Sequence, residues 1–209
     1  MINRVLCILI GYLFGNILTA EIIAYIFTGH SSSTIGTTGN PGMANMTAHV
    51  GMGAGILTLI GDVGKTILAM VICLYVCDLG KIGMFYGGLG TTLGHNFPVW
   101  RHFKGGKGVA TTCTTLILLM PVGGTLPALL GLLLILITHY LCIGAVVIPL
   151  VAIIPAYLSY SIEGLVITAI LTLLALYKNK EALSEIGRGT AERNDVVGGL
   201  KKKIESHHH

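Results

Sequence analysis

Long apolar runs, separated by short polar segments, make up most of this 209-residue chain. The apolar positions are continuous within each run, which predicts helices rather than the alternating strands of a membrane barrel. Only helices and closed barrels satisfy their backbone hydrogen bonds within lipid. Several runs are shorter than the ~20 residues of a full span. These runs are therefore tilted, partly interfacial or wrongly divided. We expect about seven transmembrane helices, over residues 5–27, 53–77, about 82–98, 108–122, 125–142, 144–160 and 163–177.

The composition supports this interpretation. Hydrophobic residues make up 53% of the chain and charged residues 11%, whereas a soluble domain carries about 25% charged residues. We therefore expect an all-α integral membrane protein with a single domain over residues 1–203. The tail over 204–209 ends in His207–His209, which resemble the remnant of a purification tag. No basic run alternates with aromatic residues, so the expected partner is the lipid bilayer and not nucleic acid.

The distribution of charge predicts the orientation. Basic residues cluster at 101–107 and 178–203, and an excess of Lys and Arg marks the cytoplasmic side. Seven spans place the N-terminus outside and the C-terminus inside. The polar segment at 30–47 lies two spans before 101–107 and is therefore on the same side. Three polar segments should then converge on the cytoplasmic face, although Arg4 at the opposite end is a weak counter-signal.

The sequence FKGGKGV at 103–109 is the sharpest candidate for chemistry. Consecutive glycines let backbone amides turn toward a ligand, and Lys104 and Lys107 add two positive charges. A loop of this kind that leads into a helix near Val109 is suited to bind phosphate. The alternative is a basic anchor that only fixes the topology. GDVGKT at 61–66 is not a nucleotide-binding P-loop, because Leu59 occupies the position of the required first glycine.

The other candidates are more ambiguous. In GTTGNPGMANMT at 36–47, Asn40 and Asn45 offer donors and acceptors on a fixed turn, although an ordinary connecting loop is the alternative. Asp62 and Lys65 form either a functional pair or a mutually neutralising one at the bilayer edge. His95 is either a general base or a structural imidazole. Glu21 is expected to reach the interface or to pair with a cation there.

Two common kinds of chemistry are not expected. None of the histidines at 30, 49, 95, 102 and 139 is followed by aspartate after four intervening residues, so the His-x4-Asp pair of many CoA-dependent acyltransferases is absent. The five cysteines all fall in predicted spans, where we expect small buried hydrophobic residues. Cys73 and Cys77 are one helical turn apart, but nothing near them in the sequence completes a metal site. We predict neither a metal nor another cofactor.

Taken together, these segments resemble the bacterial acyl-phosphate:glycerol-3-phosphate acyltransferase family (the PlsY family). The resemblance lies in YLFGNILTAEIIA at 12–24, GTTGNPGMAN at 36–45, GDVGK at 61–65 and GHNFPVWRHFKGGKGVAT at 94–111. It implies an enzyme of the bacterial plasma membrane with its site on the cytoplasmic face. Such an enzyme moves a fatty acyl group from acyl phosphate to the sn-1 hydroxyl of glycerol 3-phosphate, without coenzyme A. The products are lysophosphatidic acid and inorganic phosphate.

The residues and the resemblance together define a candidate site. We expect catalytic roles for Lys104, Lys107, His95 and Asn45. Substrate contacts are expected from Thr38, Gly39, Asn40, Gly42, Gly105, Gly106, Gly108, Lys65, Asn179 and Glu192. The chain departs from the family pattern at Ala48, Asn179 and Ala182, where arginine, histidine and asparagine are frequent. These departures leave two alternatives open: a paralogue with a different acceptor, or a non-catalytic regulator that binds lipid phosphates. A small-anion transporter is a third, although no inverted repeat is evident.

Overall fold

The computed structural model describes residues 1–36 and 39–191. These residues form eight α-helices and two short 3-10 turns, and they contain no strand. The 3-10 turns are Ser32–Thr34 and Val99–Arg101. The helices are α1 (Ile2–Gly15), α2 (Thr19–Thr28), α3 (Met43–His49), α4 (Met52–Val76), α5 (Gly80–Asn96), α6 (Val109–Leu119), α7 (Pro121–Thr138) and α8 (Leu141–Gly187). The all-α prediction is confirmed.

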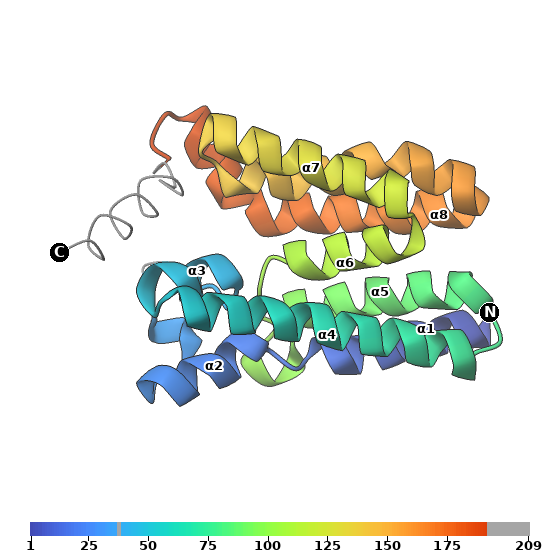
Figure 1. Cartoon of the computed structure of the whole chain (residues 1–209), viewed down its shortest axis with the longest axis horizontal. Coiled ribbons are helices and arrows are strands. Elements are labelled where there is room, and N and C mark those ends of the chain that lie inside the picture. Colours follow the sequence, from blue (N-terminus) through green and yellow to red (C-terminus); the bar gives the residue numbers. More distant parts are fainter. Residues whose placement is uncertain (37–38, 192–209) are drawn as a thin grey trace.

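The chain crosses the bundle seven times (Figure 1). α1 and α2 together form the first crossing, interrupted at residues 16–18, and α4 to α7 form the next four. α8 supplies two, because its backbone leaves the helical region at Tyr160 and Ser161, where Ser161 has φ 53°. The N-terminus and the end of α8 consequently lie at opposite ends of the bundle. Among the described residues, four segments are long and apolar enough to span a membrane, including Ile2–Thr28 and Met52–Val76.

Some predicted boundaries were wrong. The break expected between residues 122 and 125 falls at Met120, because Pro121 begins α7 at a position where its missing N–H is not needed. The break expected at 142–144 falls at His139, which has φ 62°. The last helix continues to Gly187 instead of ending at 177, because its polar final turns are rich in Lys, Glu, Ala and Leu, which favour helix.

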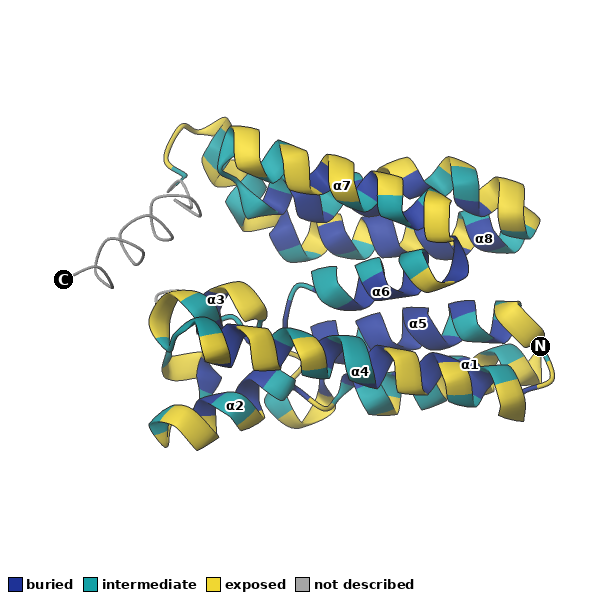
Figure 2. Ribbon diagram, in the orientation of Figure 1, coloured by how far each residue is buried: buried dark blue, intermediate teal, exposed yellow. Residues whose placement is uncertain are grey.

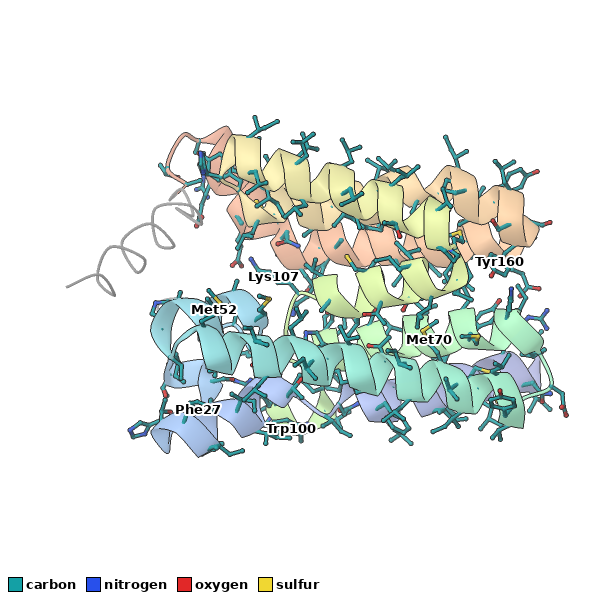
Figure 3. All side chains as sticks on the ribbon, viewed as in Figure 1. Phe27, Met52, Met70, Trp100, Lys107 and Tyr160 are labelled. Atoms are coloured by element: carbon teal, nitrogen blue, oxygen red, sulfur yellow. The ribbon has the colours of Figure 1, made fainter. Side chains whose placement is uncertain are left out.

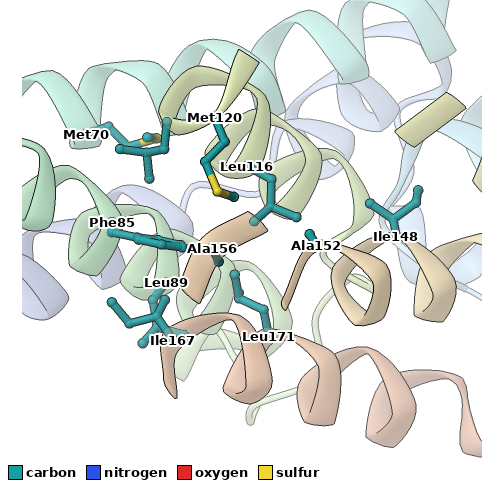
Figure 4. Close-up of a cluster of buried hydrophobic side chains, with 11 residues drawn as sticks. Met70, Phe85, Leu89, Leu116, Met120, Ile148, Ala152, Ala156, Ile167 and Leu171 are labelled. Carbon is teal, nitrogen blue, oxygen red and sulfur yellow. The ribbon is translucent and has the colours of Figure 1, made fainter. Parts of the chain in front are cut away.

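Close contact between glycine backbones joins α1 to α5. A Cβ on Gly11 would lie 2.0 Å from the carbonyl oxygen of Gly87, and one on Gly15 would lie 2.2 Å from that of Thr91. Small residues allow membrane helices to approach in this way. The largest core cluster unites α4, α5, α6 and α8 around Phe85, Leu116 and Leu171 (Figure 4). Large apolar side chains also remain exposed along the outside of the bundle (Figure 2), as expected of a surface that faces lipid.

Candidate active site

The first two polar segments meet at one end of the bundle. The Glu21 carboxylate accepts hydrogen bonds from the Ser31 hydroxyl at 2.6 Å, from the Ser32 amide at 3.2 Å, and from the Ser32 hydroxyl. An Arg101 guanidinium nitrogen lies 3.2 Å from the same carboxylate. Glu21 thus pairs with a cation, as expected, and ties the loop after α2 to the loop after α5.

The C-terminal polar segment joins the same end through Lys178. Its ammonium donates to the carbonyl oxygen of Asn96 at 3.0 Å and to that of Gly105 at 3.2 Å. It also lies 5.1 Å from the centre of the Phe97 ring. The predicted convergence of three polar segments at one end of the bundle is therefore confirmed. Sequence reasoning missed Lys178, although a lysine directly after a long apolar run was an available signal.

The unwound residues between α1 and α2 anchor the start of the long loop. The Asn16 side-chain oxygen accepts from the Val99 amide at 2.9 Å, and its backbone oxygen accepts from the Trp100 indole at 2.8 Å. The next carbonyl, that of Ile17, accepts from the Lys65 ammonium at 2.8 Å. The interruption of the first crossing thus exposes backbone groups that hold the loop at 97–108 in place.

The amides of Gly105 and Gly106 do not face a ligand, contrary to the prediction. The Gly105 amide donates to the carbonyl oxygen of Asn96 at 3.2 Å, and the Gly106 amide donates to that of His95 at 2.9 Å. The glycines are instead required by packing: a Cβ on Gly105 would lie 2.1 Å from the His95 carbonyl oxygen, and one on Gly106 would lie 2.1 Å from His95 Nε2. Their place in substrate binding stays a prediction.

The amides that are available begin at Lys107. Gly108, with φ 74°, precedes α6, and the helix start has no side-chain cap. Within the described part of the chain, the amides of residues 107–111 donate to no protein acceptor. The Lys104 and Lys107 ammonium groups likewise form no ion pair or hydrogen bond with any described residue, and Figure 3 places Lys107 at the start of α6. A helix N-terminus beside free lysines attracts phosphate.

A buried polar network supports this loop from below. The Lys65 ammonium lies 2.7 Å from the Asp62 carboxylate and 3.0 Å from His95 Nδ1. Thr19 donates to the same carboxylate at 2.5 Å. A charged ammonium has only protons to donate, so His95 Nδ1 is the acceptor in its contact with Lys65. The same nitrogen lies 3.5 Å from the Asp62 carboxylate. Asp62 and Lys65 therefore neutralise each other within the bundle, and the sequence had not indicated that His95 joins them.

His95 and Lys65 consequently lie beneath the loop and not on its outer surface. Their exposed fractions are 4% and 6%, and Gly106 covers His95 Nε2. The arrangement favours a positioning role for both, while direct contact of either with substrate stays a prediction.

The first polar loop is braced by Asn45. Its side-chain nitrogen donates to the carbonyl oxygen of Ile35 at 3.0 Å, and its side chain is buried. Gly39 has φ 55°, and the Gly42 amide donates to the carbonyl oxygen of Asn40 at 2.9 Å immediately before α3. The fixed turn predicted here is present. Thr38 and Glu192 lie outside the described residues.

Two buried carboxamides keep atoms without a partner. Asn96 has neither its side-chain nitrogen nor its oxygen bonded to a described residue, and the Asn179 side-chain oxygen is also unpaired. The Asn179 nitrogen donates to the carbonyl oxygen of Ala175 at 2.9 Å. Asn96 lies against the start of α6, since a Cβ on Gly108 would be 2.5 Å from its oxygen. Buried polar atoms usually have partners, so both side chains are suited to meet a polar ligand or water.

An open apolar groove of about 300 Å³ runs between α4 and α6. Because α6 rises 1.5 Å per residue, the stretch from Ala110 to Leu118 extends about 12 Å from the lysine-bearing end. The groove could hold an alkyl chain whose head lies at the start of α6. The lining residues are Leu59, Val63, Ile67, Ala110, Cys113, Thr114, Ile117 and Leu118.

The membrane bundle, the lysines at the start of α6 and the adjoining apolar groove together place the chain in the class of membrane proteins that bind lipid phosphates. A model of the glycerol-3-phosphate acyltransferase family matches residues 5–189. Glycerol-3-phosphate acyltransferase 1 of Lactobacillus johnsonii is 38% identical over 197 residues, which cover 94% of this chain and 95% of the relative. The protein of the same name from Lactobacillus acidophilus is 37% identical over 201 residues, covering 96% and 97%. The chain belongs to the glycerol-3-phosphate acyltransferase family.

Solved structures agree with this assignment. The glycerol 3-phosphate form of PlsY (YgiH), an integral membrane glycerol 3-phosphate acyltransferase, matches with a TM-score of 0.82 at 26% identity, covering 94% of this chain and 98% of that one. The lysophosphatidic acid form of the same protein matches with a TM-score of 0.79 at 25% identity, covering 91% and 94%. The resemblance of residues 12–111 to the PlsY family is therefore confirmed.

Proposed function

We propose that this chain transfers a fatty acyl group from acyl phosphate to the sn-1 hydroxyl of glycerol 3-phosphate, giving lysophosphatidic acid and inorganic phosphate. The observation that carries the proposal is the start of α6, where uncapped amides and the ammonium groups of Lys104 and Lys107 have no hydrogen-bond or ion-pair partner among the described residues. Membership of the family supports the acyl acceptor, because the related PlsY has been solved with glycerol 3-phosphate and with lysophosphatidic acid.

The position of the apolar groove next to the charged end supports acyl phosphate as the donor. The groove begins at Ala110, one residue after the start of α6. A donor with phosphate at the α6 amides and Lys107 could place its alkyl chain along the groove. Burial of each methylene contributes about 0.8 kcal/mol, so the groove supplies affinity while the lysines fix the reacting end.

The chemistry requires one substitution at the acyl carbon. The sn-1 hydroxyl oxygen attacks the carbonyl carbon, the bond from that carbon to the phosphate oxygen breaks, and inorganic phosphate leaves. Lys104 and Lys107 stabilise the negative charge that develops on phosphate. The hydroxyl proton passes to a phosphate oxygen of the donor, because His95 is covered by Gly106 on one side and bonded to Lys65 on the other. Asn45 and Lys65 act by holding the two loops.

The proposed donor is tested by offering purified protein glycerol 3-phosphate with either palmitoyl phosphate or palmitoyl-CoA. We expect lysophosphatidic acid only from palmitoyl phosphate, because a thioester carries no phosphate at the reacting bond for Lys107 to hold. A site with buried polar groups can favour one substrate over another by about 10⁴-fold in this way. Comparable turnover with both donors would refute the proposed mechanism. If neither donor yields lysophosphatidic acid or inorganic phosphate, a non-catalytic binding protein would be favoured.

A role for His95 as general base has its own test. Substitution His95→Ala should lower kcat/KM through loss of loop geometry, without removing a limb of the pH–rate profile. A variant that loses only the acidic limb would instead establish His95 as the base.

We further propose a multi-pass protein of the bacterial plasma membrane, with the candidate site in the cytoplasm and the N-terminus outside. The loop between α5 and α6 carries Arg101, Lys104 and Lys107, and the last turns of α8, which carry Lys178, meet it at the site end. Such an excess of basic residues favours the cytoplasm. Residues 1–203 are proposed to form one acyltransferase domain. In intact cells, a membrane-impermeant maleimide should label Ser159→Cys, at the opposite end, and spare Ser184→Cys, near the end of α8. The reverse pattern would overturn this orientation.

A further inference from the structure

Three free cysteines meet in the part of the bundle away from the candidate active site. Cys7 of α1, Cys73 of α4 and Cys77, which ends α4, have sulfur atoms that all lie within 4.8 Å of one another. All three residues are buried. Cys73 lies eight residues beyond Lys65 on α4, about 12 Å further along the helix. The sequence had indicated nothing that completes a set with Cys73 and Cys77; the packing of α1 on α4 adds Cys7.

Glycines and mostly apolar side chains pack closely against these sulfurs. A Cβ on Gly87 would lie 2.8 Å from the Cys73 sulfur, and one on Gly83 would lie 3.4 Å from the Cys7 sulfur. Partly buried Ile10, Leu79 and Tyr86 pack against the three cysteines. The Cys73 thiol donates to the carbonyl oxygen of Cys7 at 3.6 Å. An incoming ion would therefore meet three sulfur ligands in mostly apolar surroundings.

We propose that this three-thiol cluster binds a thiophilic trivalent metalloid, for which arsenite is the probe. Thiolates select soft ions. Bonds from sulfur to such ions are about 2.3 Å long, so sulfurs this close need only small side-chain movements to share one central atom. Each cysteine supplies one bond, and three bonds match the valence of trivalent arsenic.

The net charge of the bound complex favours a trivalent centre over soft ions of lower charge. Three thiolates around a monovalent or divalent ion keep a net negative charge, which is costly in an apolar interior. The cation beside this region, Arg4, lies 6.0 Å from the Tyr86 ring and is already bound to Glu163 at 2.6 Å. A trivalent centre with three thiolates is neutral and needs no counter-ion.

The binding reaction also balances without any charged species. Arsenous acid carries three hydroxyl groups on arsenic and is neutral near pH 7. Three arsenic–sulfur bonds form, three arsenic–oxygen bonds and three sulfur–hydrogen bonds break, and the thiol protons leave with the hydroxyls as three waters. No oxidant or reductant takes part, because arsenic stays trivalent and sulfur keeps its oxidation state.

The test uses the full chain, purified in detergent with reduced thiols, incubated with arsenite and desalted. Native mass spectrometry should find one arsenic per chain, with the mass increased by one arsenic less three hydrogens. Cys7→Ala, Cys73→Ala and Cys77→Ala should each lose arsenite binding. Cys142→Ala, a buried cysteine of α8 outside the cluster, should retain it.

Phenylarsine oxide serves as the folding control, because its arsenic has only two positions for thiols. Each single variant keeps two cysteines of the cluster and should still bind it. Failure of the wild-type chain to take up arsenic, or a mass that reports the loss of two hydrogens, would overturn the proposal. So would equal loss of arsenic from Cys142→Ala. The wild-type mass alone decides the matter if a variant fails to fold.

Discussion

Replacement of Lys178 by methionine provides a sharp test of how the candidate site is held together. The substitution keeps an unbranched side chain, one heavy atom shorter, and removes the ammonium that donates to the carbonyl oxygens of Asn96 and Gly105, at 3.0 and 3.2 Å. Those two carbonyls lie at the end of α5 and in the glycine loop. The loss should therefore release the loop from α8 without opening the core.

The magnitude follows from the two hydrogen bonds. A hydrogen bond to a charged group contributes about 1.5–3 kcal/mol, and both must be discounted because Lys178 is only half-buried. We expect a combined loss of about 2–3 kcal/mol in loop positioning, which corresponds to roughly a 10²-fold fall in kcat/KM. Small displacements of catalytic groups have effects of that order.

The assay measures release of phosphate and formation of lysophosphatidic acid from palmitoyl phosphate and glycerol 3-phosphate in detergent. Lys180→Met is the matched control, because Lys180 is exposed and lies 4.8 Å from the Tyr177 ring; its activity should stay within about threefold of wild type, as for most exposed substitutions. Thermal unfolding should show both variants folded. If folded Lys178→Met is as active as Lys180→Met, then Lys178 does not position the loop.

Four further predictions test other parts of the site. Lys107→Ala and Lys104→Ala should each reduce turnover by about 10²-fold, since each removes a charge-assisted contact to phosphate; near-normal rates in both would reduce the loop to a topological anchor. Gly106→Ala should cost about 1–3 kcal/mol of stability, measured by thermal unfolding, because its Cβ meets His95 Nε2 at 2.1 Å; an unchanged melting temperature would contradict this packing. Glu21→Gln should weaken the contact between the two polar loops and raise KM for glycerol 3-phosphate more than it lowers kcat; an unchanged KM would argue that the Arg101 pair is dispensable. Ile117→Trp should shorten the preferred acyl chain, measured with acyl phosphates of different lengths, if the groove between α4 and α6 holds that chain.

The sequence by itself determined the class of fold and the location of the site. Continuous apolar runs predicted helices that cross a membrane seven times, because lipid leaves the backbone no other way to satisfy its hydrogen bonds except a closed barrel. The positions of the basic segments predicted that the loops near Ser32, Arg101 and Lys178 gather at one end. Local motifs identified Lys104 and Lys107 as candidate phosphate ligands.

The tertiary structure decided what each side chain can reach. The motif at 94–111 could not reveal that the Gly105 and Gly106 amides donate to carbonyl oxygens at the end of α5, because these acceptors depend on how the loop folds back onto the helix. Burial of His95 against Lys65 is likewise a contact between α5 and α4, thirty residues apart. The three-thiol cluster needs α1 to pack on α4. A hydrophobic pattern shows which segments can enter the membrane, whereas the partners of a buried polar group depend on which helices become neighbours.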